Sequence, residues 1–198
     1  MGAGWFRGAR AWGVALALVV AGCAAPPPAK SVPVDFAGRG VIALDVASIQ
    51  IVEHYQSPMV RPHVDQLAPT PPRVAVRRWV AERLRAVGHS GSVQVIIKDA
   101  SIVETQLPRT EGLKGLFTTD QSQRYDGRIE VKIVADAPNR LVSGYAQAAA
   151  SHSITVPDDI TLAGREETWN TLVREMMGDL DDRLEHGIYD GLGPLVRR

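Results

Sequence analysis

The sequence has only one cysteine and no net charge, and each of these shortages excludes a class of protein. A single cysteine excludes an intrachain disulfide and any cysteine-rich zinc or iron–sulfur site. The 22 basic residues balance the 22 acidic ones, which argues against a surface that binds phosphate groups over its whole extent. We therefore expect no nucleic-acid partner. A hydrophobic content of 45% excludes a disordered chain, and 198 residues fit one domain with or without a tail.

The sequence also lacks the motifs that hold metals, cofactors and reactive nucleophiles. Its five histidines form no HExxH motif and no pair at helix or strand spacing. There is no phosphate-binding loop, no G-x-G-x-x-G segment and no G-x-S-x-G elbow. Ser151-His152-Ser153 and the later Asp158 and Asp159 are of catalytic-triad residue types, but His152 would face away from both serines in a strand. We interpret this segment as a solvated strand end, and we expect no metal, no cofactor and no enzymatic activity.

The first 22 residues have the form of a secretory signal peptide. Arg7 and Arg10 precede an apolar run over residues 11–21, and the segment contains no acidic residue. The run is too short to cross a hydrocarbon core of about 30 Å as a helix, which requires roughly 20 apolar residues. A transmembrane anchor is therefore the weaker interpretation, and residues 1–22 are predicted to be a signal peptide.

Val20-Ala21-Gly22-Cys23 resembles the lipobox of bacterial lipoproteins. The resemblance implies that the Cys23 thiol is diacylated, that the chain is cut before it and that the new amino terminus is acylated. The alternative is that Cys23 ends an ordinary signal peptide or is a buried thiol. In enteric lipoproteins an aspartate after the cysteine retains the protein at the inner membrane, and here that position is Ala24. The resemblance therefore implies a lipid anchor at the periplasmic face of the outer membrane.

The mature chain is predicted to consist of a tether and one domain. Residues 23–40 comprise the lipidated cysteine and a proline-rich tether, in which Pro26-Pro27-Pro28 favours an extended chain. The folded part is expected to start near Phe36 or Val41. The single periplasmic domain is assigned to residues 41–190, followed by a C-terminal tail at residues 191–198.

Hydrophobic periodicity predicts the order strand, helix, three strands, helix for this domain. The clearest period of two runs from Tyr125 to Val134. The two helical stripes contain Trp79 and Trp169, and we expect both indoles in or beside one core. The fold class is α+β, a four-stranded, mostly antiparallel sheet with both helices packed on one face. The predicted strands are residues 41–55, with a bulge or bend near Ala47-Ser48, and residues 93–106, 125–134 and 141–154. The predicted helices are residues 72–87 and 162–186.

Residues 107–124 form a long connection between two predicted strands. Leu113, Leu116 and Phe117 lie in it beside glycines. Connections of this length are usually functional or disordered. Three large apolar side chains favour a contact loop that docks on a partner or dips into a membrane, while the alternative is that they fold back over the sheet edge.

The first predicted helix carries a basic face opposite its apolar stripe. This face carries five arginines, which Glu82 alone offsets: Arg73, Arg77, Arg78, Arg83 and Arg85. Guanidinium groups suit phosphate and carboxylate groups, so lipid head groups or an acidic partner are one interpretation. The other interpretation is an ordinary solvated helix face.

The lipobox and the element order together resemble the ABC-type transport auxiliary lipoproteins, which are partners of MCE-type phospholipid transport. The similar segments are a first strand ending near Tyr55, a proline-rich connection and the helical segment RWVAERL at residues 78–84. The chain is also similar to the lipoprotein family that plugs the outer-membrane lipopolysaccharide translocon, at the helix end over residues 84–88 and the strands that follow. These resemblances carry over no functional residue except Cys23.

We therefore expect a non-enzymatic, outer-membrane-anchored accessory protein of envelope lipid transport of the ABC/MCE type. Its expected partners are envelope transport or assembly proteins, with phospholipid or lipopolysaccharide as a possible ligand. The alternatives are a translocon lipoprotein of lipopolysaccharide assembly, a structural envelope lipoprotein and a periplasmic hydrolase. A hydrolase requires a secluded pocket with a titratable pair of shifted pKa, whereas a structural lipoprotein requires neither a pocket nor an apolar docking surface.

Overall fold

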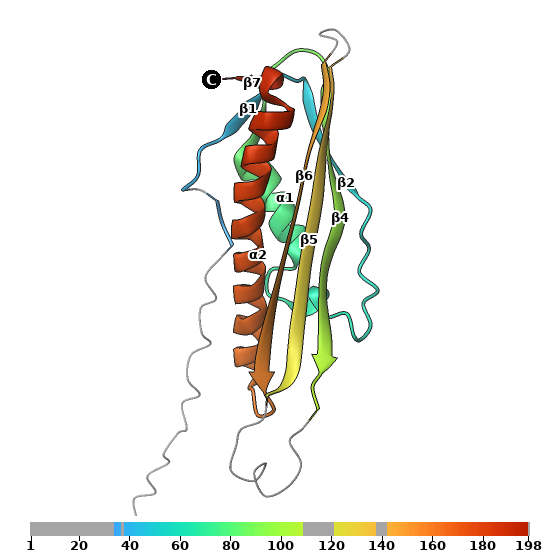
Figure 1. The fold of residues 1–198 in the computed structure, drawn as a ribbon, viewed down its shortest axis with the longest axis vertical. Coiled ribbons are helices and arrows are strands. Elements are labelled where there is room, and N and C mark those ends of the chain that lie inside the picture. Colours follow the sequence, from blue (N-terminus) through green and yellow to red (C-terminus); the bar gives the residue numbers. More distant parts are fainter. Residues whose placement is uncertain (1–33, 37, 109–120, 138–141, 198) are drawn as a thin grey trace, which may run out of the picture.

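The fold is an elongated sheet covered along its length by one long helix (Figure 1). The computed structural model describes residues 34–36, 38–108, 121–137 and 142–197. The elements are β1 (Ile42–Leu44), β2 (Ser48–Glu53), the 3-10 turn η1 (Asp65–Leu67), α1 (Pro72–Arg83), β3 (Leu84–Ala86), β4 (Ser92–Gln106), β5 (Gln121–Ala137), β6 (Val142–Pro157), α2 (Leu162–Gly191), the 3-10 turn η3 (Gly193–Leu195) and β7 (Val196–Arg197).

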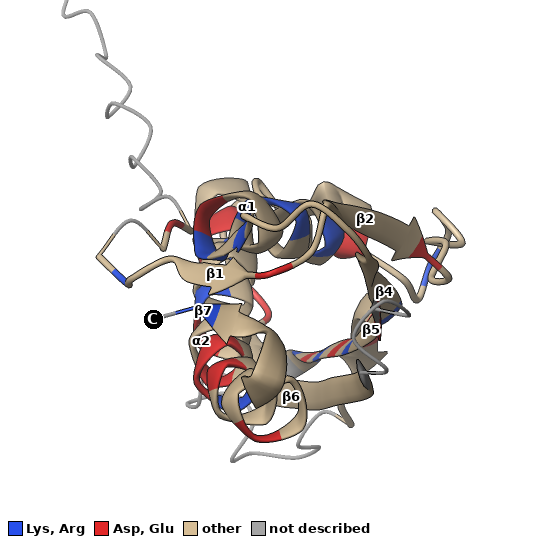
Figure 2. Ribbon diagram, turned by 90° about the horizontal axis from the view of Figure 1, so that it is seen from above, with Lys and Arg blue, Asp and Glu red and all other residues tan. Residues whose placement is uncertain are grey.

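The predicted four-stranded sheet is confirmed and has the strand order β2-β4-β5-β6. β2 pairs in parallel with β4, and β4, β5 and β6 are antiparallel neighbours. The parallel pair follows from the crossover through α1, because a parallel strand must return to the same end of the sheet. Viewed along the long axis, the sheet curves and the two helices close its open side (Figure 2). The α+β fold class with both helices on one face is therefore confirmed.

The core lies between the sheet and the helices. Val93, Val95 and Ile97 of β4 are fully buried, and the pairing with β5 then shifts register between Ile97 and Asp99. This bulge changes which residues face inward, so Ala100 and Ile102 continue the core. The two expected core tryptophans, in α1 and α2, are both buried in the same hydrophobic cluster, as predicted.

A second sheet, with the order β3-β1-β7, was not predicted. The long strand expected at residues 41–55 is divided by residues 45–47, so that β1 enters the small sheet and β2 the large one. The helix expected to reach Val87 ends at Arg83, because Leu84 is extended and pairs with Ile42 in parallel register. The apolar stripe of the predicted helix continues through Leu84 to Val87. The sequence pattern therefore does not indicate that the helix ends and a strand begins at Leu84.

The ends of the domain also differ from the prediction. α2 continues to Gly191 rather than to residue 186. Residues 191–198 were assigned to a tail, but Leu192 and Leu195 are fully buried and β7 pairs with β1, so residues 192–197 belong to the fold. At the other end, Val34 and Phe36 are buried in the core, so the fold includes the earlier of the two expected starts, Phe36, and the bounds 41–190 are too narrow.

Two glycines of α2 provide a matched test of how closely this helix approaches β6. A Cβ atom at Gly191 would lie 2.2 Å from the backbone oxygen of Tyr145, whereas a Cβ atom at Gly178 would meet nothing within 4 Å. We expect Gly191→Ala to destabilise the fold by about 1–3 kcal/mol through this clash. Gly178→Ala is expected to stabilise it by about 0.5–1 kcal/mol, since alanine favours the helix. Urea unfolding of both variants measures the difference, and equal effects would contradict the close approach.

Candidate functional site at the loop end of the sheet

The predicted docking residues Leu113, Leu116 and Phe117 lie outside the residues that the structure describes. The structure does describe the strands on either side of this connection. β4 ends at Gln106, β5 begins at Gln121, and α2 begins at this same end of the molecule (Figure 1). The connection predicted at residues 107–124 is therefore shorter at its second end, because residues 121–124 already pair with β6 and β4. We call this end of the molecule, where β4 ends and β5 and α2 begin, the loop end.

The proline-rich segment after β2 reaches the loop end along the edge of β4. β2 ends at Glu53. Beyond this residue, the proline-rich segment lies along the edge of β4 in place of a strand. The Glu104 N–H donates to the Pro62 oxygen at 2.8 Å, and the Val64 N–H donates to the Ile102 oxygen at 2.9 Å. These bonds satisfy β4 backbone groups that would otherwise form an open edge. From the sequence, this segment is identified only as a proline-rich connection, and the structure shows that it also completes the sheet edge.

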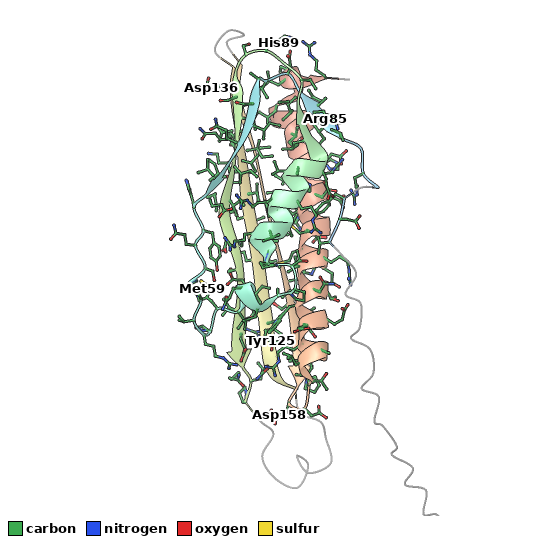
Figure 3. All side chains as sticks on the ribbon, turned by 180° about the vertical axis from the view of Figure 1, so that it is seen from behind. Met59, Arg85, His89, Tyr125, Asp136 and Asp158 are labelled. Carbon is green, nitrogen blue, oxygen red and sulfur yellow. The ribbon has the colours of Figure 1, made fainter. Side chains whose placement is uncertain are left out.

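This arrangement exposes large apolar side chains near the loop end. Met59 is 69% exposed and Val60 is 63% exposed in the proline-rich segment, and Leu162 is 70% exposed at the start of α2. Figure 3 shows Met59 and Tyr125 in the same end of the molecule as Asp158, which lies in the turn before α2. Exposed apolar side chains therefore occur on two described segments near the loop end, in addition to those predicted in the connection between β4 and β5.

A buried polar cluster lies beneath these residues. Glu104 is buried, although it carries a charge, and it accepts hydrogen bonds from Arg61 Nη1 at 3.1 Å and Gln106 Nε2 at 2.9 Å. The Tyr125 hydroxyl donates to Gln123 Oε1 at 3.2 Å. Burial raises the pKa of the Tyr125 hydroxyl, which stays protonated and acts as a donor. A buried carboxylate requires such partners, because an unpaired one would neutralise instead.

The rings of Tyr125 and Trp169 connect the sheet to α2 in this cluster. Their centroids lie 5.5 Å apart at an interplanar angle of 74°, an edge-to-face arrangement. Arg165 lies one helical turn before Trp169 on α2. Sequence reasoning assigned Trp169 to the core but did not single out Arg165 or Glu104, because no local pattern shows which distant charged residues lie within electrostatic range of Tyr125.

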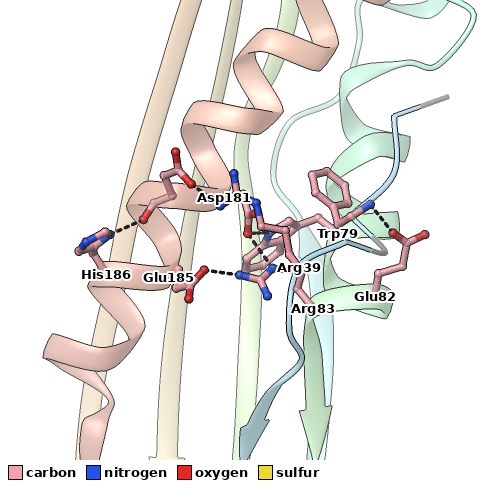
Figure 4. A network of polar contacts seen from close by, with 9 residues as sticks. Arg39, Trp79, Glu82, Arg83, Asp181, Glu185 and His186 are labelled. Atoms are coloured by element: carbon pink, nitrogen blue, oxygen red, sulfur yellow. Dashed lines mark hydrogen bonds and ion pairs between the residues drawn. The ribbon is translucent and has the colours of Figure 1, made fainter. Parts of the chain in front are cut away.

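A second polar cluster holds α1, α2 and the N-terminal segment together (Figure 4). Arg83 of α1 and Asp181 of α2 are each 1% exposed. Asp181 Oδ1 accepts hydrogen bonds from Arg83 Nε at 2.8 Å and from Trp79 Nε1 at 2.7 Å. Glu185 contacts the same guanidinium group through Nη2. This buried network fixes the two helices against each other, and we call it the Asp181 network.

The segment that follows the predicted tether is bound to the Asp181 network. Arg39 Nε lies 3.4 Å from Asp181 Oδ2, and Arg39 also pairs with Asp182, whose hydrogen bond raises the pKa of the Arg39 guanidinium further. The Phe36 N–H donates to Glu82 Oε2 at 2.8 Å, and Arg78 Nη1 donates to the Val34 oxygen at 2.7 Å. The chain therefore enters the domain at the helical side, midway between its two ends (Figure 1).

The arginines predicted as a lipid- or partner-binding face have partners within the protein. Arg77 Nε lies 3.2 Å from Glu53 Oε1, and Arg73 Nη1 lies 3.8 Å from Glu53 Oε2. Arg78 binds the Val34 backbone, as described above. Arg73 and Arg77 keep more than half of their side-chain surface exposed. Arg83 was also predicted on this face, but it is 1% exposed and binds Asp181, so that part of the prediction is wrong. Arg78 has a structural role, while Arg73 and Arg77 share a carboxylate at the surface.

His152 was interpreted as part of a solvated strand end, but the structure gives it partners on α2. His152 Nε2 lies 3.1 Å from Asp179 Oδ2, and Nδ1 lies 3.8 Å from Glu175 Oε2. Ser151 and Ser153 are exposed, and Ser153 Oγ donates to Asp126 Oδ1 at 2.6 Å. The serines and the imidazole thus bind different partners.

Two searches of the described residues concern other kinds of site. Within the described ranges, no group of three or more histidine, aspartate and glutamate side chains is arranged to hold a metal ion. Among the same residues, neither α1 nor α2 combines the length and the apolar composition that crossing a membrane requires.

Comparison with known proteins returns lipoproteins among the solved structures. No family model matches the chain. No curated protein matches it either. Rare lipoprotein B from Shewanella oneidensis aligns at a TM-score of 0.39 and 13% identity, over 72% of this chain and 94% of that one. A minor lipoprotein from Acinetobacter baumannii aligns at 0.36 and 11%, over 78% and 98%. A Xanthomonas campestris protein of the DUF330 family aligns at 0.34 and 9%, over 79% and 91%. These scores lie below 0.5, so the likenesses establish neither a family nor a function for this chain.

Proposed function

We propose that the protein is a lipid-anchored lipoprotein of the outer membrane that serves as a non-enzymatic accessory in envelope lipid transport of the ABC/MCE type. The observation that carries the proposal is the segment Val20-Ala21-Gly22-Cys23, which follows an apolar run of signal-peptide length. Two or three acyl chains, at about 0.8 kcal/mol per buried methylene, anchor a protein stably without a membrane-spanning helix.

The architecture suits an adaptor domain held on a tether. The tether enters at the helical side, where Arg39 and Phe36 are bound to α1 and α2. The loop end is therefore separated from the point of attachment and is available for contact with a membrane or a partner. Met59, Val60 and Leu162 supply exposed apolar surface there, and fully burying such a side chain contributes about 1.5–3 kcal/mol.

Serine substitution of the predicted docking residues tests this role. Replacing Leu113, Leu116 and Phe117 together with serine should abolish recovery of the transport partner and of phospholipid from detergent-solubilised membranes. The melting temperature should change little, since surface substitutions usually alter stability by no more than about 0.5 kcal/mol. Affinity purification with protein and lipid mass spectrometry measures recovery, and thermal unfolding measures stability.

A matched control comes from exposed apolar residues at the opposite end of the molecule. Val41, Val87 and Tyr189 are 45%, 45% and 47% exposed, and their joint replacement with serine should leave recovery unchanged. A loop variant that unfolds while its folded fraction still binds would contradict the docking role, because the three side chains would then pack inward. Recovery of a lipopolysaccharide translocon instead of a phospholipid transporter would favour the translocon family. Recovery of neither would overturn the transport role.

A further inference from the structure

Two buried N–H donors on one face of α2 have no hydrogen-bond acceptor among the residues that the structure describes. Trp169 is 3% exposed, and within the part of the chain that the structure describes its Nε1 has no hydrogen-bond partner. The same is true of Arg165 Nε, which is also buried. Residues four apart on a helix are neighbours on its surface, so the two donors share one face. Because buried donors in native proteins are nearly always paired, two unpaired donors in one place indicate a missing acceptor.

The charges around these donors favour an anion as that acceptor. Glu104, the buried carboxylate of the cluster, is already bound by Arg61 and Gln106. Burial is the largest cause of the raised pKa of Tyr125. Arg165 and Arg61 act to lower this pKa and Glu104 acts to raise it, so all three charged groups lie within electrostatic range of the Tyr125 hydroxyl. The opposite charges of Arg61 and Glu104 neutralise each other. Among the described residues, no carboxylate forms an ion pair with Arg165, so this part of the chain supplies no counterion for its charge.

The position of Arg165 adds to this preference. It lies in the first turn of a 30-residue helix, where the helix dipole and the free backbone N–H groups also favour negative charge. Arg165 is only partly buried, so an anion can reach its guanidinium group from solvent. Leu162, in the same turn, is strongly exposed and offers apolar contact beside the charge.

We propose that Arg165 and Trp169 bind an oxyanion, the phosphate group of a lipid head, at the loop end. The guanidinium group supplies charge and Nε–H, the indole supplies a second N–H, and Leu162 lies where an acyl chain would leave the head group. The choice of a lipid as the source rests on the proposed function. The oxyanion chemistry rests on the two donors alone, and free inorganic phosphate satisfies it equally.

Indole N–H signals provide the test, with an internal control. The full protein is purified in a maltoside detergent, which carries no phosphate, after labelling of its tryptophans with ¹⁵N, and Trp79→Phe and Trp169→Phe assign the two domain signals. The Trp79 indole already donates to Asp181 at 2.7 Å. Dihexanoyl phosphatidic acid should shift the Trp169 signal downfield and leave the Trp79 signal in place. Dihexanoylglycerol, which lacks the phosphate, should shift neither.

Charge-neutralising variants distinguish binding at a specific site from nonspecific electrostatic attraction between the protein and the phosphate group. Arg165→Gln should weaken phosphatidic acid binding by about 10- to 100-fold, the range for loss of a charged hydrogen bond. Arg183→Gln, which removes an exposed arginine of the same helix, should not weaken it. A shift produced equally by inorganic phosphate would support the oxyanion site and assign its source to free phosphate. No shift with either phosphate compound, or equal loss in both variants, would overturn the site. This outcome is independent of membrane anchoring, so it leaves the proposed function to its own test.

Discussion

Replacing Asp181 with alanine is expected to lower the free energy of unfolding by about 3 kcal/mol, a large share of the roughly 5–15 kcal/mol typical of a domain. The substitution removes the acceptor of both Arg83 Nε and Trp79 Nε1, and both of those side chains are fully buried. Glu185 still contacts Arg83, but it is 35% exposed and bonds only Nη2. A buried guanidinium group left with one peripheral partner is the reason for the large effect.

Urea unfolding followed by circular dichroism measures this change. Asp182→Ala is the matched control, since Asp182 is the neighbouring residue and, among the described residues, its side chain pairs only with Arg39. Both side chains are largely exposed. An exposed pair contributes at most about 1 kcal/mol. The double variant Arg83→Met/Asp181→Leu should regain part of the loss, because it removes both charges from the interior. If Asp181→Ala cost no more than Asp182→Ala, the Asp181 network would not hold the two helices together.

Replacing Cys23 with serine is expected to remove the protein from membrane fractions or to leave an uncleaved precursor. The thiol is the attachment point that the lipobox resemblance implies, and serine cannot form the thioether. Acyl chains provide about 0.8 kcal/mol per buried methylene, so their loss removes the whole proposed anchoring energy at once. Fractionation of cells, with washing of the membranes in high salt, measures the change in location.

Ala24→Ser is the matched control for this experiment, because it places the same side chain one position later and leaves the thiol in place. It should remain in the membrane fraction. Mass spectrometry of the processed wild-type protein should find Cys23 at the amino terminus with its acyl groups. A processed protein with a free, unmodified thiol would contradict the anchor and with it the proposed function.

The main strands and helices could be predicted because the hydrophobic periodicity that indicates them involves only nearby residues. The period of two from Tyr125 to Val134 lies in β5, and the apolar stripe of α2 marks the helix that covers the sheet. In both elements the buried face is visible in the sequence itself, since side chains alternate in strands and return every 3.6 residues in helices. The predicted lipid attachment at Cys23 is local in the same sense, because it depends on four adjacent residues.

Partnerships between distant residues were decided only by the tertiary structure. Leu84 continues the apolar stripe of α1, yet it is extended because Ile42 offers a parallel strand to pair with. In the sequence, Asp181 is one of several acidic residues on a long helix. It is the centre of a buried network because the fold places it beside Arg83, which is 98 positions away in the sequence. The buried donors of Arg165 and Trp169 likewise become visible only in the tertiary structure, where neither has an acceptor among the described residues. The sequence determined which faces are apolar, because that depends on nearby residues. It did not determine which buried polar groups meet, because a hydrogen bond depends on a distance across the fold that no local pattern encodes.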